Sequence, residues 1–137
     1  MKYLLDTSVI SQTAKDRPQG AAIAWLGTVD LTETFLSAIT FAELRRGAEK
    51  LPEGRKRREL EVWLGAEVAV EYGKRIFPVD VVVADLAGQL SVEAERVGLN
   101  LDLTDFLIAA TARVHGLQVA TLNRKHLEKL GVELVEF

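Results

Sequence analysis

The feature that most constrains this chain is the alternation of short apolar runs with longer segments of helical periodicity. Runs with the composition of buried strands lie at residues 3–5, 34–39, 75–79, 117–121 and 132–135, and Pro78 favours a sheet edge for the third. Apolar residues recur at helical spacing over residues 8–15, 21–29, 40–50, 55–72, 81–97 and 104–115. This alternation predicts an α/β fold in three layers, with a short, mostly parallel sheet of about five strands flanked by helices.

Length and composition narrow the class of protein. The 137 residues fit one domain over residues 1–137, and 48% hydrophobic with 27% charged residues is typical of a globular chain. The absence of cysteine excludes thiolate zinc sites and cysteine nucleophiles and fits a reducing cytoplasm. Two histidines, His115 and His126, are too few for a three-histidine metal site. With no signal peptide and no apolar run near the roughly 20 residues that span a bilayer, no membrane partner is expected.

The charge of the chain argues against a general electrostatic RNA coat. Seventeen basic and twenty acidic residues give a net charge of −3. Residues 44–61 are an exception, with seven basic and four acidic side chains, although the run at 55–58 is more simply a solvated helix start. Arg45 and Arg46 follow Glu43 closely, and Arg124 follows the fourth strand candidate, so these three arginines are candidate RNA contacts.

Three acidic residues stand where parallel strands would deliver them to one rim of the sheet. Asp6 directly follows the first apolar run, Glu43 lies four residues after the second, and Asp105 opens the last long helical segment. Carboxylates gathered in one place repel each other unless a cation lies among them. Oxygen ligands without cysteine favour Mg²⁺ or Mn²⁺, and such an ion can activate water against a phosphodiester.

Each of these acids also has a purely structural explanation. Asp6 is placed to cap a helix at its N-terminus. Thr40 and Glu43 have the spacing of a capping box. Asp105 would be favoured near the positive end of its helix. Only their joint placement after successive strands favours a shared site.

Four short motifs occur in order along nearly the whole chain. They are LLDTSVIS at 4–11, SAITFAELRRG at 37–47, DFLIAATA at 105–112 and VATLN at 119–123. Each is weak alone, but together they resemble the PIN-domain ribonucleases, specifically the VapC-type toxins of type II toxin–antitoxin pairs. The resemblance implies a PIN-like fold and a Mg²⁺- or Mn²⁺-dependent endoribonuclease. It also implies a cognate antitoxin held in a groove among the N-terminal helices, an RNA substrate and a homodimer.

The resemblance assigns roles to particular residues of this chain. It places the catalytic, metal-binding acids at Asp6, Glu43 and Asp105. The polar residues that it associates with positioning water or phosphate are Thr7, Ser8, Thr121 and Asn123.

One departure from the family pattern keeps an alternative open. Many relatives carry a fourth acid just after the fourth strand, where this chain has Asn123 and His126. Binding of one metal ion rather than two is therefore unsettled by the sequence, and so is activity itself. The alternative is a catalytically weak or inactive PIN-like binding module that acts through a protein partner. A third hypothesis, in which Asp6 accepts a phosphoryl group, lacks the second aspartate that such sites need, because position 8 is Ser8.

Overall fold

The sheet of this protein consists of short parallel strands only. The computed structural model describes residues 1–137 throughout. Four strands pair in the order β3-β2-β1-β4, and every pairing is parallel. Their bounds are β1 Tyr3–Leu5, β2 Thr34–Ser37, β3 Ile76–Phe77 and β4 Gln118–Ala120. The parallel α/β architecture expected from the alternation is confirmed, and β3 lies at a sheet edge as Pro78 indicates.

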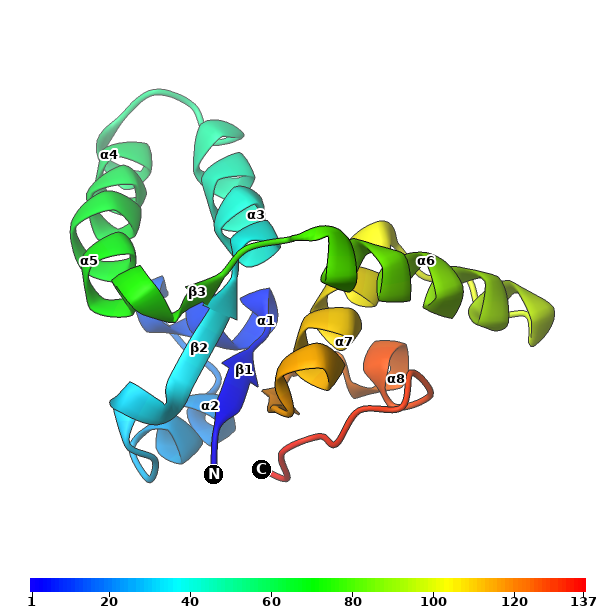
Figure 1. Ribbon diagram of the computed structural model, residues 1–137. Helices are drawn as coiled ribbons and strands as arrows, with labels where there is room; N and C mark the ends of the chain where they lie inside the picture. The colour runs from blue at the N-terminus through cyan, green and yellow to red at the C-terminus, as the bar shows by residue number, and fades with distance from the viewer.

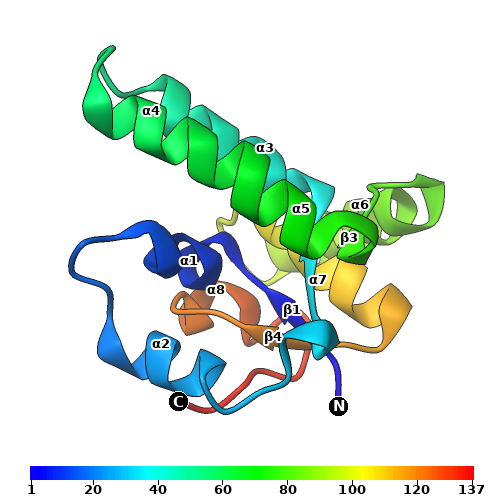
Figure 2. The same cartoon turned by 90° about the vertical axis from the view of Figure 1, so that its left-hand side faces the viewer.

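Helices cover both faces of the sheet, which gives the three layers (Figures 1 and 2). Their bounds are α1 Thr7–Ile10, α2 Gly20–Leu26, α3 Ala38–Glu49, α4 Arg55–Val62, α5 Ala69–Tyr72, α6 Val81–Arg96, α7 Leu103–His115 and α8 Arg124–Leu127. Glycines with positive φ, Gly98 and Gly116, lie just beyond the last residues of α6 and α7, where such glycines commonly end a helix. No helix has the length and apolar composition that crossing a bilayer requires.

Adjacent residues of β1 supply the two halves of the core. Leu4 packs against α6, α7 and α8, whereas Leu5 packs against α1, α2 and the segment that leads into α5. Because successive strand side chains point to opposite faces, one short strand contributes to both apolar clusters. Each fully buried leucine stabilises the fold by about 1.5–3 kcal/mol, so β1 is anchored from both sides.

The long helical segment expected over residues 55–72 is continuous but not uniform. It runs as α4, a π-helical stretch over Trp63–Val68, and α5. Together with α3 it forms a long hairpin that extends beyond the sheet (Figure 2). Leu64 and Val68, both in the π-helical stretch, are buried against the sheet face that Leu5 supplies.

The fifth strand expected at residues 132–135 does not form. Leu134 makes a single parallel bridge to Val119, with backbone hydrogen bonds on either side of it. Beyond that bridge the carboxyl-terminal tail makes other contacts. The guanidinium of Arg124 donates to the carbonyl of Val135 at 2.7 Å, and the ring of Phe137 stacks on Trp25. The sheet therefore has four strands rather than five.

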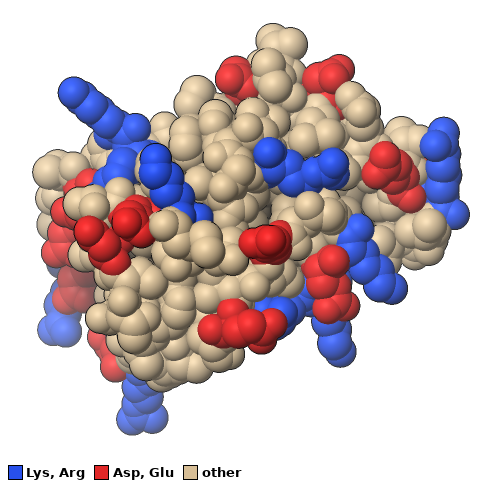
Figure 3. All heavy atoms as spheres, turned by 60° about the horizontal axis from the view of Figure 1, so that its bottom comes forward, with Lys and Arg blue, Asp and Glu red and all other residues tan.

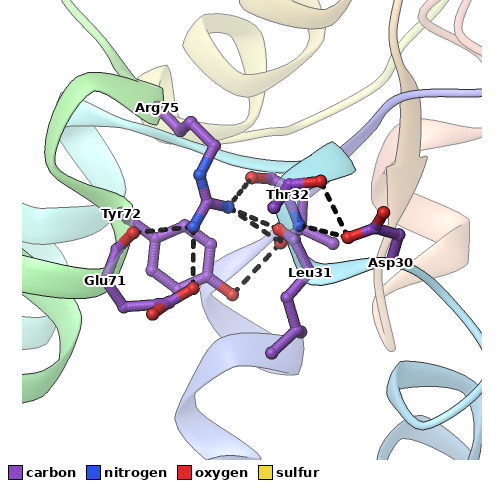
Figure 4. Close-up of polar contacts among 7 residues, drawn as sticks. Asp30, Leu31, Thr32, Glu71, Tyr72 and Arg75 are labelled. Atoms are coloured by element: carbon purple, nitrogen blue, oxygen red, sulfur yellow. Dashed lines mark hydrogen bonds and ion pairs between the residues drawn. The ribbon is translucent and has the colours of Figure 1, made fainter.

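Arg75 ties the edge strand β3 to the start of β2 (Figure 4). Its guanidinium donates to the Thr34 carbonyl at 2.6 Å, to the Leu31 carbonyl at 2.5 Å and to the Glu71 carboxylate at 2.9 Å. It also lies over the ring of Tyr72, 4.7 Å from the ring centroid. A two-residue strand has few ladder bonds of its own, so these contacts hold β3 in register.

Replacing Arg75 by alanine should destabilise the fold by about 1–3 kcal/mol, because backbone carbonyls lose a charged donor. Urea unfolding monitored by circular dichroism measures this change. Arg58→Ala is the matched control, since Arg58 is exposed and forms no ion pair. Equal unfolding midpoints for the Arg75 variant and the wild-type protein would show that the contacts in Figure 4 contribute nothing.

Candidate functional site

Asp6 is held at the carboxyl end of β1 by three hydrogen bonds to its carboxylate. Oδ1 accepts from the backbone N–H of Thr7 at 2.8 Å. Oδ2 accepts from Ser8 Oγ at 2.9 Å and from Thr121 Oγ1 at 2.7 Å. Register explains the contact with Thr121, because Leu5 is paired with Ala120 and the next residue of each strand meets at the rim. Asp6 caps α1, as its position indicates, and it is also almost fully buried.

Glu43 does not take part in the capping box that its spacing from Thr40 suggested. Helix α3 begins at Ala38, and Ser37 caps it by accepting from the N–H of Ile39 at 3.2 Å. Thr40 therefore lies inside the helix, and Glu43 lies beyond its first turn. The Glu43 carboxylate instead accepts from Thr7 Oγ1 at 2.5 Å, which fixes α3 against α1 at the rim.

Asp105 lies in the first turn of α7, which opens with a capping box. Asp102 is the N-cap residue, and Oδ2 of Asp105 accepts the backbone N–H of Asp102 at 3.3 Å. The same oxygen lies 3.6 Å from Nδ1 of His126, which comes from α8. The Asp105 carboxylate is thus aimed back toward the rim by the geometry of the helix start.

The three acids line one pocket of about 320 Å³ that has no hydrophobic residue in its wall. Because the strands are parallel, the segments that leave their carboxyl ends share one rim, so acids far apart in sequence meet there. The complete lining is Asp6, Thr7, Ser8, Ser11, Glu43, Asp102, Thr104, Asp105, Asn123 and His126.

Burial and mutual repulsion disfavour ionisation in this pocket. The pKa of Glu43 is raised, first by burial and then by the charges of Asp6, Asp105 and Asp102. The pKa of Asp105 is raised by burial and by Asp6 and Asp102, while His126 opposes the shift. Both carboxyls therefore feel other negative charges in the same pocket, which is the electrostatic condition under which a cation is bound.

The acids share a pocket without forming a ready-made coordination shell. No three acidic or histidine side chains are close enough, as placed, to hold one ion. The reason lies in their hydrogen bonds, because Glu43 is drawn to Thr7 and Asp105 to the Asp102 N–H. These side chains must therefore move before their oxygens could bind one ion together.

The hydroxyls singled out in the sequence are engaged by the acids. Thr7 donates to Glu43, and Ser8 and Thr121 donate to Asp6. Thr121 is buried and absent from the pocket wall, so its hydroxyl orients Asp6. The Asn123 side chain reaches the pocket, while its backbone N–H donates to Thr121 Oγ1 at 2.9 Å.

The candidate RNA-contacting arginines lie outside the pocket wall. Arg45 pairs with Glu49 at 3.6 Å, and Arg124 is bound to the carboxyl-terminal tail through Val135 and Glu136. Arg46 is exposed and forms no ion pair. Basic and acidic side chains alternate over the face drawn in Figure 3, which shows no broad patch of one sign.

An apolar groove adjoins the acidic pocket. It runs between the segment after β1 and the α3–α4 hairpin, with a volume of about 360 Å³, and shares Thr7, Ser11 and Glu43 with the pocket. Leu60 and the half-buried Trp63 contribute to its wall. Nothing in the sequence pattern distinguished this face from ordinary core, because the same leucine and tryptophan spacing is found in buried helices.

Replacing Glu43 by glutamine should stabilise the metal-free protein at neutral pH. Glutamine still accepts from Thr7 but removes a charge that Asp6 and Asp105 oppose. Because the carboxylates are only half-buried, solvent screening limits the gain to about 1 kcal/mol. Thermal unfolding in EDTA measures this difference.

The advantage of the glutamine variant is lost on acidification. The pKa of Glu43 is higher in the folded protein than its unfolded value of 4.5. As the pH falls through the folded-state pKa, wild-type Glu43 binds a proton and the protein recovers the stability that the charge had cost. The advantage of Glu43→Gln should therefore vanish below that pH. A variant less stable than wild type at pH 7 would contradict the repulsion.

Comparison with known proteins gives the family of the chain. The family model of the PIN domain matches residues 3–132 of this chain. The sequence is 40% identical over 118 residues to the toxin FitB of Neisseria gonorrhoeae, covering 86% of this chain and 85% of that protein. It is 35% identical over 132 residues to the VapC ribonuclease Y4jK of Sinorhizobium fredii, covering 96% and 94%. The crystal structure of FitAcB from Neisseria gonorrhoeae superposes with a TM-score of 0.90 at 36% identity, covering 98% of this chain and 96% of that one. This protein therefore belongs to the PIN domain family.

Proposed function

We propose that this protein is a Mg²⁺- or Mn²⁺-dependent endoribonuclease, the toxin of a VapBC-type toxin–antitoxin pair, with Asp6, Glu43 and Asp105 as its catalytic, metal-binding acids. The observation that carries the proposal is the pocket without hydrophobic lining, in which three carboxylates from distant segments meet and the pKa values of two of them, Glu43 and Asp105, are raised by burial and by neighbouring negative charge. Similarity to a named toxin and a named VapC ribonuclease over most of the chain supports the same conclusion.

The residues present suit a hard divalent cation. Carboxylate oxygens are the ligands that Mg²⁺ and Mn²⁺ prefer, and no lysine or arginine lines the pocket to neutralise them instead. When bound, such an ion supplies a water nucleophile at neutral pH and neutralises charge that develops on the phosphodiester.

The chain itself holds the acids in place for that task. Asp6 accepts three hydrogen bonds, so the orientation of its carboxylate is fixed. Thr7 positions Glu43, and the start of α7 positions Asp105. Asn123 lies at the pocket wall, where its amide can orient a water molecule or a phosphate oxygen.

Replacing Asp105 by asparagine should reduce RNA cleavage on the order of a hundredfold or more, because an ion ligand is lost. Asparagine can still accept from the Asp102 N–H, so the helix start and the fold should be preserved. Cleavage of total cellular RNA in Mn²⁺, followed by gel electrophoresis, provides the measurement. Asp6→Asn should have the same effect.

The matched control is Asp85→Asn, an exposed position on α6 away from the pocket. It should cleave at the wild-type rate. A well-folded Asp105→Asn protein with wild-type activity would show that the acids are assigned wrongly.

The apolar groove supplies a place for the antitoxin. A chain seated against Leu60 and Trp63 would lie beside Glu43 and Thr7, which belong to both the groove and the acidic pocket. Binding there can therefore cover the acids directly. Val81 and Val82 of α6 are exposed and lie outside the groove, and they provide apolar area for the homodimer that the resemblance implies.

Leu60→Glu should weaken antitoxin binding at least about tenfold, because a charge is placed in an apolar contact. Val62→Glu is the matched control, since Val62 is 63% exposed two residues further along the helix and lies outside the groove. Calorimetric titration of each variant with the cognate antitoxin measures the difference. Equal weakening by both substitutions would place the antitoxin elsewhere.

The alternative of an inactive binding module keeps two supporting observations. Neither Asn123 nor His126 supplies the acid that many relatives carry after the fourth strand, and the acids present do not form a finished coordination shell. Such a module would show no Mn²⁺ binding that depends on Asp105. Family membership gives no support to the hypothesis that Asp6 accepts a phosphoryl group.

A further inference from the structure

A fourth acid reaches the pocket from a segment that the family pattern does not mark. Asp102 lies just before α7 as its N-cap residue, and it lines the same pocket as Asp6, Glu43 and Asp105. Its side chain is exposed and forms no ion pair with any lysine, arginine or histidine.

The charge of Asp102 acts on the other acids of the pocket. It opposes ionisation of both Glu43 and Asp105, although these carboxylates come from different helices. Geometry places Asp102 beside them, because it lines the same pocket and its backbone N–H donates to Oδ2 of Asp105 at 3.3 Å. The pocket wall thus carries four carboxylates and one imidazole, with no lysine or arginine.

We infer that Asp102 serves as the fourth carboxylate of the ion-binding pocket, in place of the acid that the segment after β4 lacks. This inference rests on the proposed function, because it concerns the same divalent ion. Asp102 draws the ion into the pocket and holds it there, either by direct contact or through a coordinated water molecule. Asp102 thereby supplies, from the start of α7, the acid that positions 123 and 126 lack.

Helix capping alone is the competing explanation for Asp102. It occupies the N-cap position of α7, where aspartate and asparagine are about equally favourable. Asparagine at this position therefore keeps the cap and removes only the charge. A pure capping role predicts unchanged metal binding in Asp102→Asn, whereas a role in holding the ion predicts weaker binding.

The experiment is a calorimetric titration of the full chain with Mn²⁺ alone. Asp102→Asn should weaken binding about tenfold, the range expected for residues that support a metal site. Asp102→Glu should recover part of the loss. Asp80→Asn is the matched control, because Asp80 caps α6 in the same way, accepting from the Val83 N–H at 3.0 Å, but lies outside the pocket.

The outcomes separate this inference from the proposed function. Wild-type affinity in Asp102→Asn, with binding lost in Asp105→Asn, overturns the role of Asp102 and leaves the nuclease proposal standing. Absence of Mn²⁺ binding in the wild-type protein overturns both. Equal weakening in Asp102→Asn and Asp80→Asn also overturns the role of Asp102, because the effect would then follow from a lost charge anywhere on the surface.

Discussion

Parallel pairing of β1 with β2 and β4 is the constraint on which the rest of this structure depends. Parallel strands deliver their carboxyl ends to the same edge, so the segments that follow β1 and β2 leave from one rim, and α7 starts there as well. Asp6, Glu43 and Asp105 are brought together by this geometry although up to 99 residues separate them in the chain. The hydrogen bonds from Thr7 and Thr121 then fix the carboxylates against each other's repulsion.

The carboxylates that suit this rim for binding an ion also lower the stability of the metal-free fold. Burial and repulsion raise the pKa of Glu43 and of Asp105, so ionisation of these two groups costs more here than in water, and a cation would offset that cost. A chain selected for stability alone would have placed neutral side chains there. The surrounding architecture offsets this cost, because Leu4 and Leu5 anchor β1 in both apolar clusters and Arg75 fixes the edge strand.

Much of the architecture follows from local sequence. The parallel sheet, the edge position of β3 and the helix ends at Gly98 and Gly116 were all predictable, because periodicity and glycine act locally. The resemblance to PIN-domain proteins, based on four motifs, is confirmed by the family match. The prediction of a fifth strand was wrong. Only Leu134 forms a bridge, and the rest of the tail contacts Arg124 and Trp25, which are distant side chains that the local sequence pattern does not reveal.

The candidate site was predictable only in part. The shared pocket of three acids follows from the strand-to-helix order, but the partner of Glu43 does not, because α3 starts at Ala38 and frees Glu43 for Thr7. Asp102 was missed, since it precedes a helix rather than following a strand. Its place in a capping box with Asp105 was the available signal.

The central claim is that the acids of this rim jointly hold one or more divalent ions. Anomalous diffraction from a crystal soaked in Mn²⁺ tests it most directly. The account predicts a strong anomalous peak within the pocket, bounded by oxygens of Asp6, Glu43 and Asp105. Density for Mn²⁺ only at acids elsewhere on the surface, with this pocket containing water alone, would contradict it.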